Sequence, residues 1–240
     1  MLFSVGYAVK TDDLLVIEII KLKKDISEVY FSWGDFPNGR SSQTLSDNYT
    51  PWEMIDIQKD MLKSLSDEGI SLNLLLNANC YGKESQSRAF FNKIGDTMDY
   101  ISSNYGLSSI TTTSPLIAKF AKNNFDNLEV RASVNMEIGT IQGMEYIAEY
   151  FDSYYMKREL NRDFEAIECL HNWCTQNGKK LYMLANSGCL NYCSAHNFHD
   201  NLVAHENEIS MMDNAYNFTG VCREFLKNED NLENIPRRKE

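Results

Sequence analysis

The residues best suited to chemistry are cysteines in the last quarter of the chain. Cys189 and Cys193 form a C-x3-C pair directly after a predicted strand, and Cys222 follows 29 residues after Cys193. Thiolates are ligands for zinc and for iron–sulfur clusters, and a cluster usually takes four of them. A C-x3-C spacing lets two sulfurs reach one site from a tight loop or from the first turn of a helix. The pattern predicts a metal or cluster site built by these three cysteines, with buried free thiols as the alternative.

A fourth ligand has to come from elsewhere in the chain. Cys80 ends a predicted strand and points toward the face on which a parallel barrel carries its site, so we predict it as the fourth thiolate. A structural role for Cys80 is the alternative. As an alternative to Cys80, His199 would be the fourth ligand, and three cysteines with one histidine form a set that suits zinc. In either case the segment 194–221 would form a cap over the site, closed at its far end by Cys222.

Two cysteines of a predicted helix are not assigned to the site. Cys174 continues an apolar stripe at helical spacing, so we expect it to be buried in the core. It also lies near the C-terminal end of that helix, on the barrel face opposite the active site, and Cys169 shares this position. The stripe consists of Phe164, Ile167, Leu170 and Cys174.

Arginine and amide side chains follow several of the predicted strands. The candidates for a substrate site are Arg40, Asn77, Arg131, Asn135 and Asn186. In a parallel barrel the catalytic groups lie where strands end, and these side-chain types can orient a carboxylate or an amide. We predict that Arg40 and Arg131 point into the barrel mouth; for Arg131 the alternative is a structural salt bridge to Asp35 or Glu159. For single Asn positions, the needs of tight turns are the alternative explanation.

A regular alternation of β-rich runs and helical patterns positions these residues. The predicted strands are 2–8, 28–32, 71–77, 108–112, 128–134, 153–156 and 180–185, and helical patterns separate them. Seven β-then-α units predict an α/β fold with a parallel sheet, a (β/α) TIM-type barrel that is incomplete. No eighth strand is evident, so we expect the chain to be a fragment. We predict a barrel domain over 1–228 with a cysteine-bearing loop at 186–222, followed by a polar tail or truncated continuation at 229–240.

Two of the predicted helices have readable faces. Thr50-Pro51-Trp52-Glu53 is a capping box with proline at the first helical position. The helix that follows is predicted to turn Trp52, Ile55, Leu62 and Leu65 inward. In the first helix, the apolar side is predicted to consist of Leu14, Ile17 and Leu22.

Composition limits the function classes. The chain has 240 residues with 34 acidic and 23 basic side chains, a net charge of −11. Such a surface repels polyanions, so direct binding to a nucleic-acid backbone is not expected. The longest apolar stretch, 14–20, is interrupted by Glu18 and is far too short to span a bilayer. Without a secretory signal pattern at the N-terminus, we expect a soluble, cytoplasmic protein with no membrane partner.

Several segments together resemble one known family. They are SVGY, EVYFSWGDFPNGR, NLLLNANCYG, ITTTSP, EVRASVN and LANSGCLNYCSAHNFH. In this order they resemble the U32 peptidase family, often described as collagenase-like proteases, from the first strand to about Cys222. The resemblance implies a TIM-type barrel and, in several branches, a [4Fe-4S] cluster held by four cysteines. Those branches carry out oxygen-independent hydroxylation of tRNA or rRNA bases or of the ubiquinone ring, some with prephenate as the oxygen source. Cys189, Cys193 and Cys222 match the cysteine-bearing segment, whereas Cys80 does not.

Three functions follow as hypotheses. The first is an iron–sulfur enzyme that hydroxylates or otherwise modifies a small molecule or a nucleoside. The second is a peptidase, although the sequence has no G-x-S-x-G or H-E-x-x-H signature. The third is a non-catalytic barrel with a structural zinc site that acts in a complex with a related barrel.

Overall fold

The chain forms one curved sheet of seven parallel strands, in the order β1 to β7. The computed structural model describes residues 2–9, 14–34, 36–39, 49–185, 189–190, 192–205 and 221–234. The strands are β1 (Phe3–Gly6), β2 (Ile26–Phe31), β3 (Ser71–Leu76), β4 (Leu107–Thr112), β5 (Glu129–Ala132), β6 (Ser153–Tyr155) and β7 (Lys180–Tyr182). Each strand pairs in parallel with the next along the chain, which requires a crossover between every pair.

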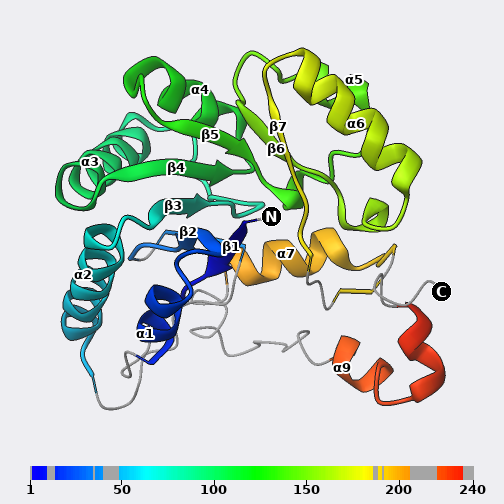
Figure 1. Ribbon diagram of the computed structural model, residues 1–240, viewed down its shortest axis with the longest axis horizontal. Helices are drawn as coiled ribbons and strands as arrows, with labels where there is room; N and C mark the ends of the chain where they lie inside the picture. The colour runs from blue at the N-terminus through cyan, green and yellow to red at the C-terminus, as the bar shows by residue number, and fades with distance from the viewer. Residues whose placement is uncertain are drawn as a thin grey trace.

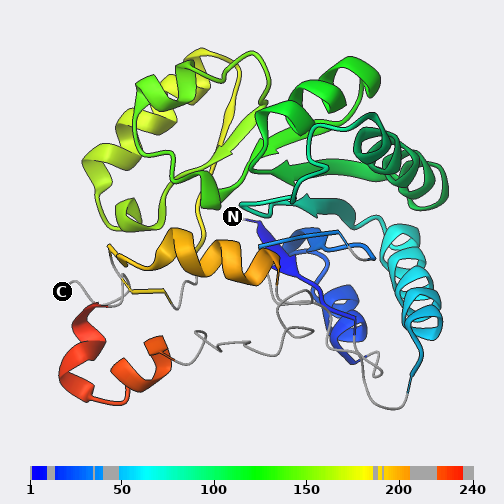
Figure 2. The ribbon, with the colours of Figure 1, turned by 180° about the vertical axis from the view of Figure 1, so that it is seen from behind.

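Helices supply these crossovers. They are α1 (Leu14–Lys21), α2 (Pro51–Asp67), α3 (Arg88–Tyr105), α4 (Pro115–Asn124), α5 (Ile141–Glu145) and α6 (Phe164–Gln176), with short 3-10 turns η1 (Val134–Met136) and η2 (Arg158–Leu160). Figure 1 shows α1 to α6 around the outer side of the curved sheet. Beyond β7 come α7 (His196–Ala204), α9 (Val221–Phe225) and η3 (Glu229–Asn234). Figure 2 shows α7 on the other side, toward the opening between the first and last strands.

This arrangement is an α/β TIM-like half-barrel, as the sequence predicts. Within the described ranges β1 pairs only with β2 and β7 only with β6, so the sheet is curled but not closed. No helix in the described part of the chain is long and apolar enough to cross a membrane.

The two faces of β3 show how the sheet separates core from site. Leu72, Leu74 and Leu76 are buried in the apolar core between the sheet and the outer helices. The alternate residues Asn73 and Leu75 line a pocket inside the barrel. Because side chains alternate between the faces of a strand, one six-residue segment contributes both to the core and to the interior pocket.

The predicted helix faces are partly wrong. The capping box of α2 is present, with Glu53 N donating to Thr50 Oγ1 and Thr50 N donating to Glu53 Oε2. Trp52, however, is 77% exposed. The buried stripe of α2 is instead Met54, Gln58, Met61, Leu62 and Leu65.

In α1 the buried residues are Val16 and Ile19, whereas Leu14, Ile17 and Leu22 are exposed. Both helices carry apolar residues on more than one side. Hydrophobic spacing alone therefore did not identify the side that faces the sheet.

Candidate functional site

Arg131 lies inside the barrel and is bound by two carboxylates. Its Nη1 and Nη2 donate to Glu28 at 2.8 and 3.0 Å, and Nη2 also donates to Glu129 at 3.1 Å. The guanidinium lies 3.9 Å from the ring centroid of Tyr182. Ser4, Asn73 and Ser109 donate further hydrogen bonds to the Glu28 carboxylate. We call Glu28, Glu129, Arg131 and their partners the barrel-floor network.

This arrangement corrects the prediction for Arg131. Its side chain is 2% exposed and paired, so it does not serve an anionic substrate at the mouth. Its partners among the described residues are Glu28 and Glu129 rather than Glu159, and Asp35 lies outside the described residues. Burial alone would raise the pKa of both carboxyls. The hydrogen bonds and charge of Arg131 lower the pKa of Glu28, and the charge of Arg131 with hydrogen bonds from Lys180 and Ser153 lowers the pKa of Glu129 to about 2. A buried guanidinium whose three nitrogens all donate to protein groups is a structural element of the barrel.

Two amide side chains and one guanidinium, each after a different strand, meet in what we call the mouth network. Asn77, after β3, accepts a hydrogen bond from Gly39 N at 2.9 Å through Oδ1. Asn135, in η1 after β5, donates to the Asn77 carbonyl at 3.3 Å. Arg158, in η2 after β6, donates through Nη2 to Asn135 Oδ1 at 2.8 Å. A Cβ on Gly39 would clash with Asn135 Nδ2, so a larger residue there would displace the Asn135 side chain.

Helix α7 is fastened across this mouth by His196. The imidazole Nδ1 pairs with Glu137, and Nε2 lies 3.1 Å from Asp200 Oδ2 and contacts Arg158 Nη1. Asp200 in turn accepts from Asn79 Nδ2 at 3.3 Å. The hydrogen bond to Asp200 outweighs burial and raises the pKa of His196. The imidazole between these two carboxylates therefore holds α7 to the loops after β3, β5 and β6.

Two residues beside the site have left-handed backbone conformations although neither is glycine. Glu137, the partner of His196, has φ 53°, and Tyr192, between Cys189 and Cys193, has φ 52°. Such conformations are unfavourable for residues with a Cβ and persist where surrounding contacts hold them. Both mark places where the backbone is held to position a side chain or a loop.

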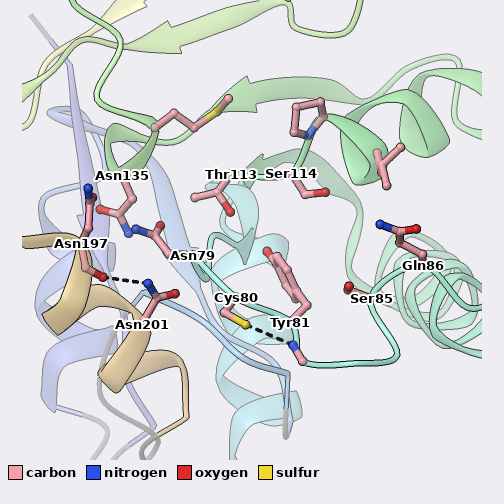
Figure 3. Close-up of a pocket in the computed structure, with 14 residues that line it drawn as sticks. Asn79, Cys80, Tyr81, Ser85, Gln86, Thr113, Ser114, Asn135, Asn197 and Asn201 are labelled. Carbon is pink, nitrogen blue, oxygen red and sulfur yellow. Dashed lines mark hydrogen bonds between the residues drawn. The ribbon is translucent and has the colours of Figure 1, made fainter.

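Two pockets meet at Asn135. The larger, of about 760 Å³, is a groove between the loops after β3 and β4 and helix α7. Figure 3 shows its wall of polar side chains, with Asn79, Asn197 and Asn201 beside Asn135, and Cys80 and Tyr81 on the other side. The smaller, of about 130 Å³, lies inside the barrel, and Asn77 and Arg158 line it. Uncharged amides and hydroxyls dominate the larger groove, which suits a neutral polar group.

Three thiols gather beside α7. A hydrogen bond joins Cys222 to Cys193, and Cys189 also lies within electrostatic reach of Cys222. Burial, followed by these two neighbouring thiols, raises the pKa of Cys222. His196 N donates to the Cys193 carbonyl at 3.2 Å, so the thiol loop leads directly into the helix that covers the mouth.

The donor types and the proximity of these thiols fit a zinc ion or an iron–sulfur cluster. As placed, however, no group of three or more His, Cys, Asp or Glu side chains among the described residues could hold a metal ion. The ligand roles of Cys189, Cys193 and Cys222 therefore stay predictions.

The remaining predicted site residues are distributed as follows. Cys80 lines the larger groove, where its Sγ accepts from Gly82 N at 3.4 Å. His199 lies on α7, and its ligand role also stays a prediction. Arg40 and Asn186 lie outside the described residues. Cys174 is buried in the core beside Met144, as predicted, and Cys169 is exposed.

Sequence reasoning missed the roles of Arg158, His196 and Glu137. The signal for His196 was present, because Asp200 follows it by one helical turn. No sequence pattern pointed to Glu137, because it follows β5 and meets His196, at the start of α7, only in the folded chain.

Comparison with known proteins supports the fold. No protein-family model matches the chain, and no curated protein matches it. Among solved structures, the U32 peptidase Mk0906 is similar with a TM-score of 0.69 and 15% identity, over 91% of this chain and 82% of that one. The 3-keto-D-glucoside 4-epimerase YcjR from E. coli has a TM-score of 0.44 at 10% identity, over 82% of this chain and 87% of that one. The likeness to Mk0906 confirms the fold that the sequence resemblance implies.

Proposed function

We propose that this chain is an iron–sulfur enzyme that modifies a small polar molecule, by oxygen-independent hydroxylation or a related reaction. Cys189, Cys193 and Cys222 would hold the cluster, with Cys80 as the candidate fourth ligand and His199 as its alternative. The observation that carries the proposal is the gathering of the three thiols beside α7, although 29 residues separate Cys193 from Cys222. Clustered thiols in a chain that needs no disulfides favour a metal or cluster over cross-linking.

The chain's own residues have separable tasks in this proposal. The cluster would supply redox or Lewis-acid chemistry when bound. His196 and Asp200 hold α7 over the mouth, and Asn135 connects the groove to the interior pocket. Arg158 and the amides orient the substrate through hydrogen bonds, which is what a few well-placed polar groups in a pocket can do.

Anaerobic purification with iron and sulfide analysis tests the proposal. We expect a brown protein with visible absorption and with iron and sulfide in equal amounts. The double variant Cys189→Ser/Cys193→Ser should lose both iron and colour while the far-UV circular dichroism spectrum is unchanged. Cys169→Ser is the matched control, because this thiol is exposed on α6 and should leave the iron content unchanged. Cys80→Ser and His199→Gln then decide the fourth ligand.

Other results would overturn this proposal. A colourless protein that binds one zinc ion per chain, with iron absent after anaerobic reconstitution, would favour a structural metal site in a complex with a related barrel. Because Mk0906 is described as a U32 peptidase, a peptidase is the second candidate function. Peptide cleavage that survives chelators and the double cysteine replacement would establish that activity instead.

A further inference from the structure

The interior pocket is small and partly open, and side chains from the strands and their following loops line it. At about 130 Å³ it is below the 300 to 1,000 Å³ typical of sites for drug-sized ligands, so its occupant is a molecule of few heavy atoms. Tyr30 and Tyr155 contribute aromatic surface, and Asn73 and Thr111 contribute polar groups toward the barrel-floor network. Asn77, Asn135 and Arg158 close it on the side of the mouth.

Arg158 is the charged residue in the lining of this pocket, and it is 9% exposed. Its Nη2 donates to Asn135, and Nη1 contacts His196. Its Nε is buried and has no hydrogen-bond partner. No ion pair joins Arg158 to a carboxylate within the part of the chain that the structure describes. Arg131, by comparison, has two carboxylates within 3.1 Å.

Two carboxylates lie beyond His196, the imidazole that Arg158 contacts. Glu137 and Asp200 pair with the two ring nitrogens of His196 rather than with Arg158. Below the pocket, Glu28 and Glu129 are paired with Arg131, and Lys180 also pairs with Glu129. These carboxylates are therefore paired with groups other than Arg158, which lines the pocket. A buried guanidinium is unfavourable unless an anion or carbonyl satisfies it.

We propose that the interior pocket binds the carboxylate group of a small substrate, with Arg158 as its counter-ion. The free Nε and the fork of the guanidinium suit the two oxygens of a carboxylate. The volume admits a group of few heavy atoms at this position, which a small organic acid supplies. This inference rests on the proposed function only in treating the pocket as its substrate site, and carboxylate binding requires no cluster.

Paired probes test the inference on the full, anaerobically purified chain. Acetate, lactate and malonate are each compared with the matching amide by NMR titration at constant ionic strength. We expect at least one carboxylate to bind about tenfold or more tightly than its amide, because a hydrogen bond to a charged group contributes at least that factor to the affinity. In Arg158→Gln this preference should disappear.

Two further variants keep the test decisive if Arg158→Gln folds poorly. Asn135→Asp places a carboxylate against Arg158 Nη2 at nearly unchanged size, so it should remove the preference by occupying the guanidinium. Arg162→Gln removes the same charge four residues away, at an exposed position outside the pocket, and should retain the preference. Equal binding of every carboxylate and its amide, or a preference that survives both Arg158→Gln and Asn135→Asp, overturns the inference.

Measurement in the Cys189→Ser/Cys193→Ser variant separates this inference from the proposed function. None of these thiols lines the interior pocket, so carboxylate binding should persist there. If the wild-type protein contains no iron but still prefers carboxylates, the proposed function fails and the anion site stands. If iron is present and the preference for carboxylates is absent, the proposed function stands and the anion site is wrong.

Discussion

Arg131→Gln tests whether the guanidinium inside the barrel stabilises the fold rather than recognising a substrate. In the wild-type protein it donates to Glu28 at 2.8 and 3.0 Å and to Glu129 at 3.1 Å, with a side chain that is 2% exposed. The substitution leaves both carboxylates inside the barrel without their guanidinium. Removing one partner of a buried ion pair costs about 3–5 kcal/mol of the free energy of unfolding. For a chain of this size, this corresponds to a Tm lowered by roughly 10 °C.

The pH dependence of stability gives a second readout. Burial raises the pKa of Glu129, but Arg131 and Lys180 outweigh burial and set it to about 2 against the usual 4.5. The lowered pKa contributes stability that is fully present above pH 4.5 and is lost as the pH falls toward 2, with a magnitude of roughly 3 kcal/mol. Without Arg131, burial dominates at Glu28 and raises its pKa above the usual value. The free energy of unfolding of the variant should therefore rise as the pH falls from about 7 to about 5, because Glu28 takes up a proton in the folded state. In the wild-type protein the ion pair gives no such rise in this pH range.

Urea unfolding followed by circular dichroism at several pH values measures both effects. Lys180→Gln is the control, because Lys180 also pairs with Glu129 at 2.7 Å but its side chain is 64% exposed. Its free energy of unfolding should lie within about 1 kcal/mol of the wild-type value. If Arg131→Gln has the wild-type urea midpoint and the wild-type pH profile, the structural role assigned to Arg131 is wrong.

Three further substitutions test other parts of the structure. Gly39→Ala forces its Cβ against Asn135 and should lower the free energy of unfolding by about 1–3 kcal/mol and weaken carboxylate binding, as urea unfolding and NMR titration would measure. Thr50→Ala removes the capping box of α2 and should cost about 1 kcal/mol in urea unfolding; no change would mean that the cap is not formed in solution. Cys174→Ser places a hydroxyl beside Met144 in the core and should cost about 1–3 kcal/mol while iron content stays the same; loss of iron would contradict its assignment to the core.

The sequence was sufficient to predict the order of the strands and the class of fold. The β-rich runs and the helical patterns between them give parallel strands joined by crossovers, and all seven predicted strands are present. Local signals also succeeded where they depend on neighbouring residues. The capping box at Thr50 depends on contacts within the first turn of α2. The burial of Cys174 follows from its place on the apolar stripe of α6.

The same local signals failed for helix faces that carry several apolar residues. Trp52 has the hydrophobicity expected of a core residue, but it lies in the first turn of α2 on the side away from the sheet. Periodicity gives the angle between apolar residues around a helix. It does not give the rotation of the helix against the sheet, which depends on how the neighbouring side chains pack.

The roles of the two arginines were decided by the tertiary structure alone. Both Arg131 and Arg158 follow or end strands, and the sequence offers no reason to separate them. Arg131 meets Glu28, which is 103 residues away along the chain, because the curvature of the sheet brings β2 and β5 to facing sides of the barrel interior. Arg158 meets an amide and an imidazole instead of a carboxylate. The strength and purpose of a buried charge depend on its partners, and only the folded chain brings those partners together.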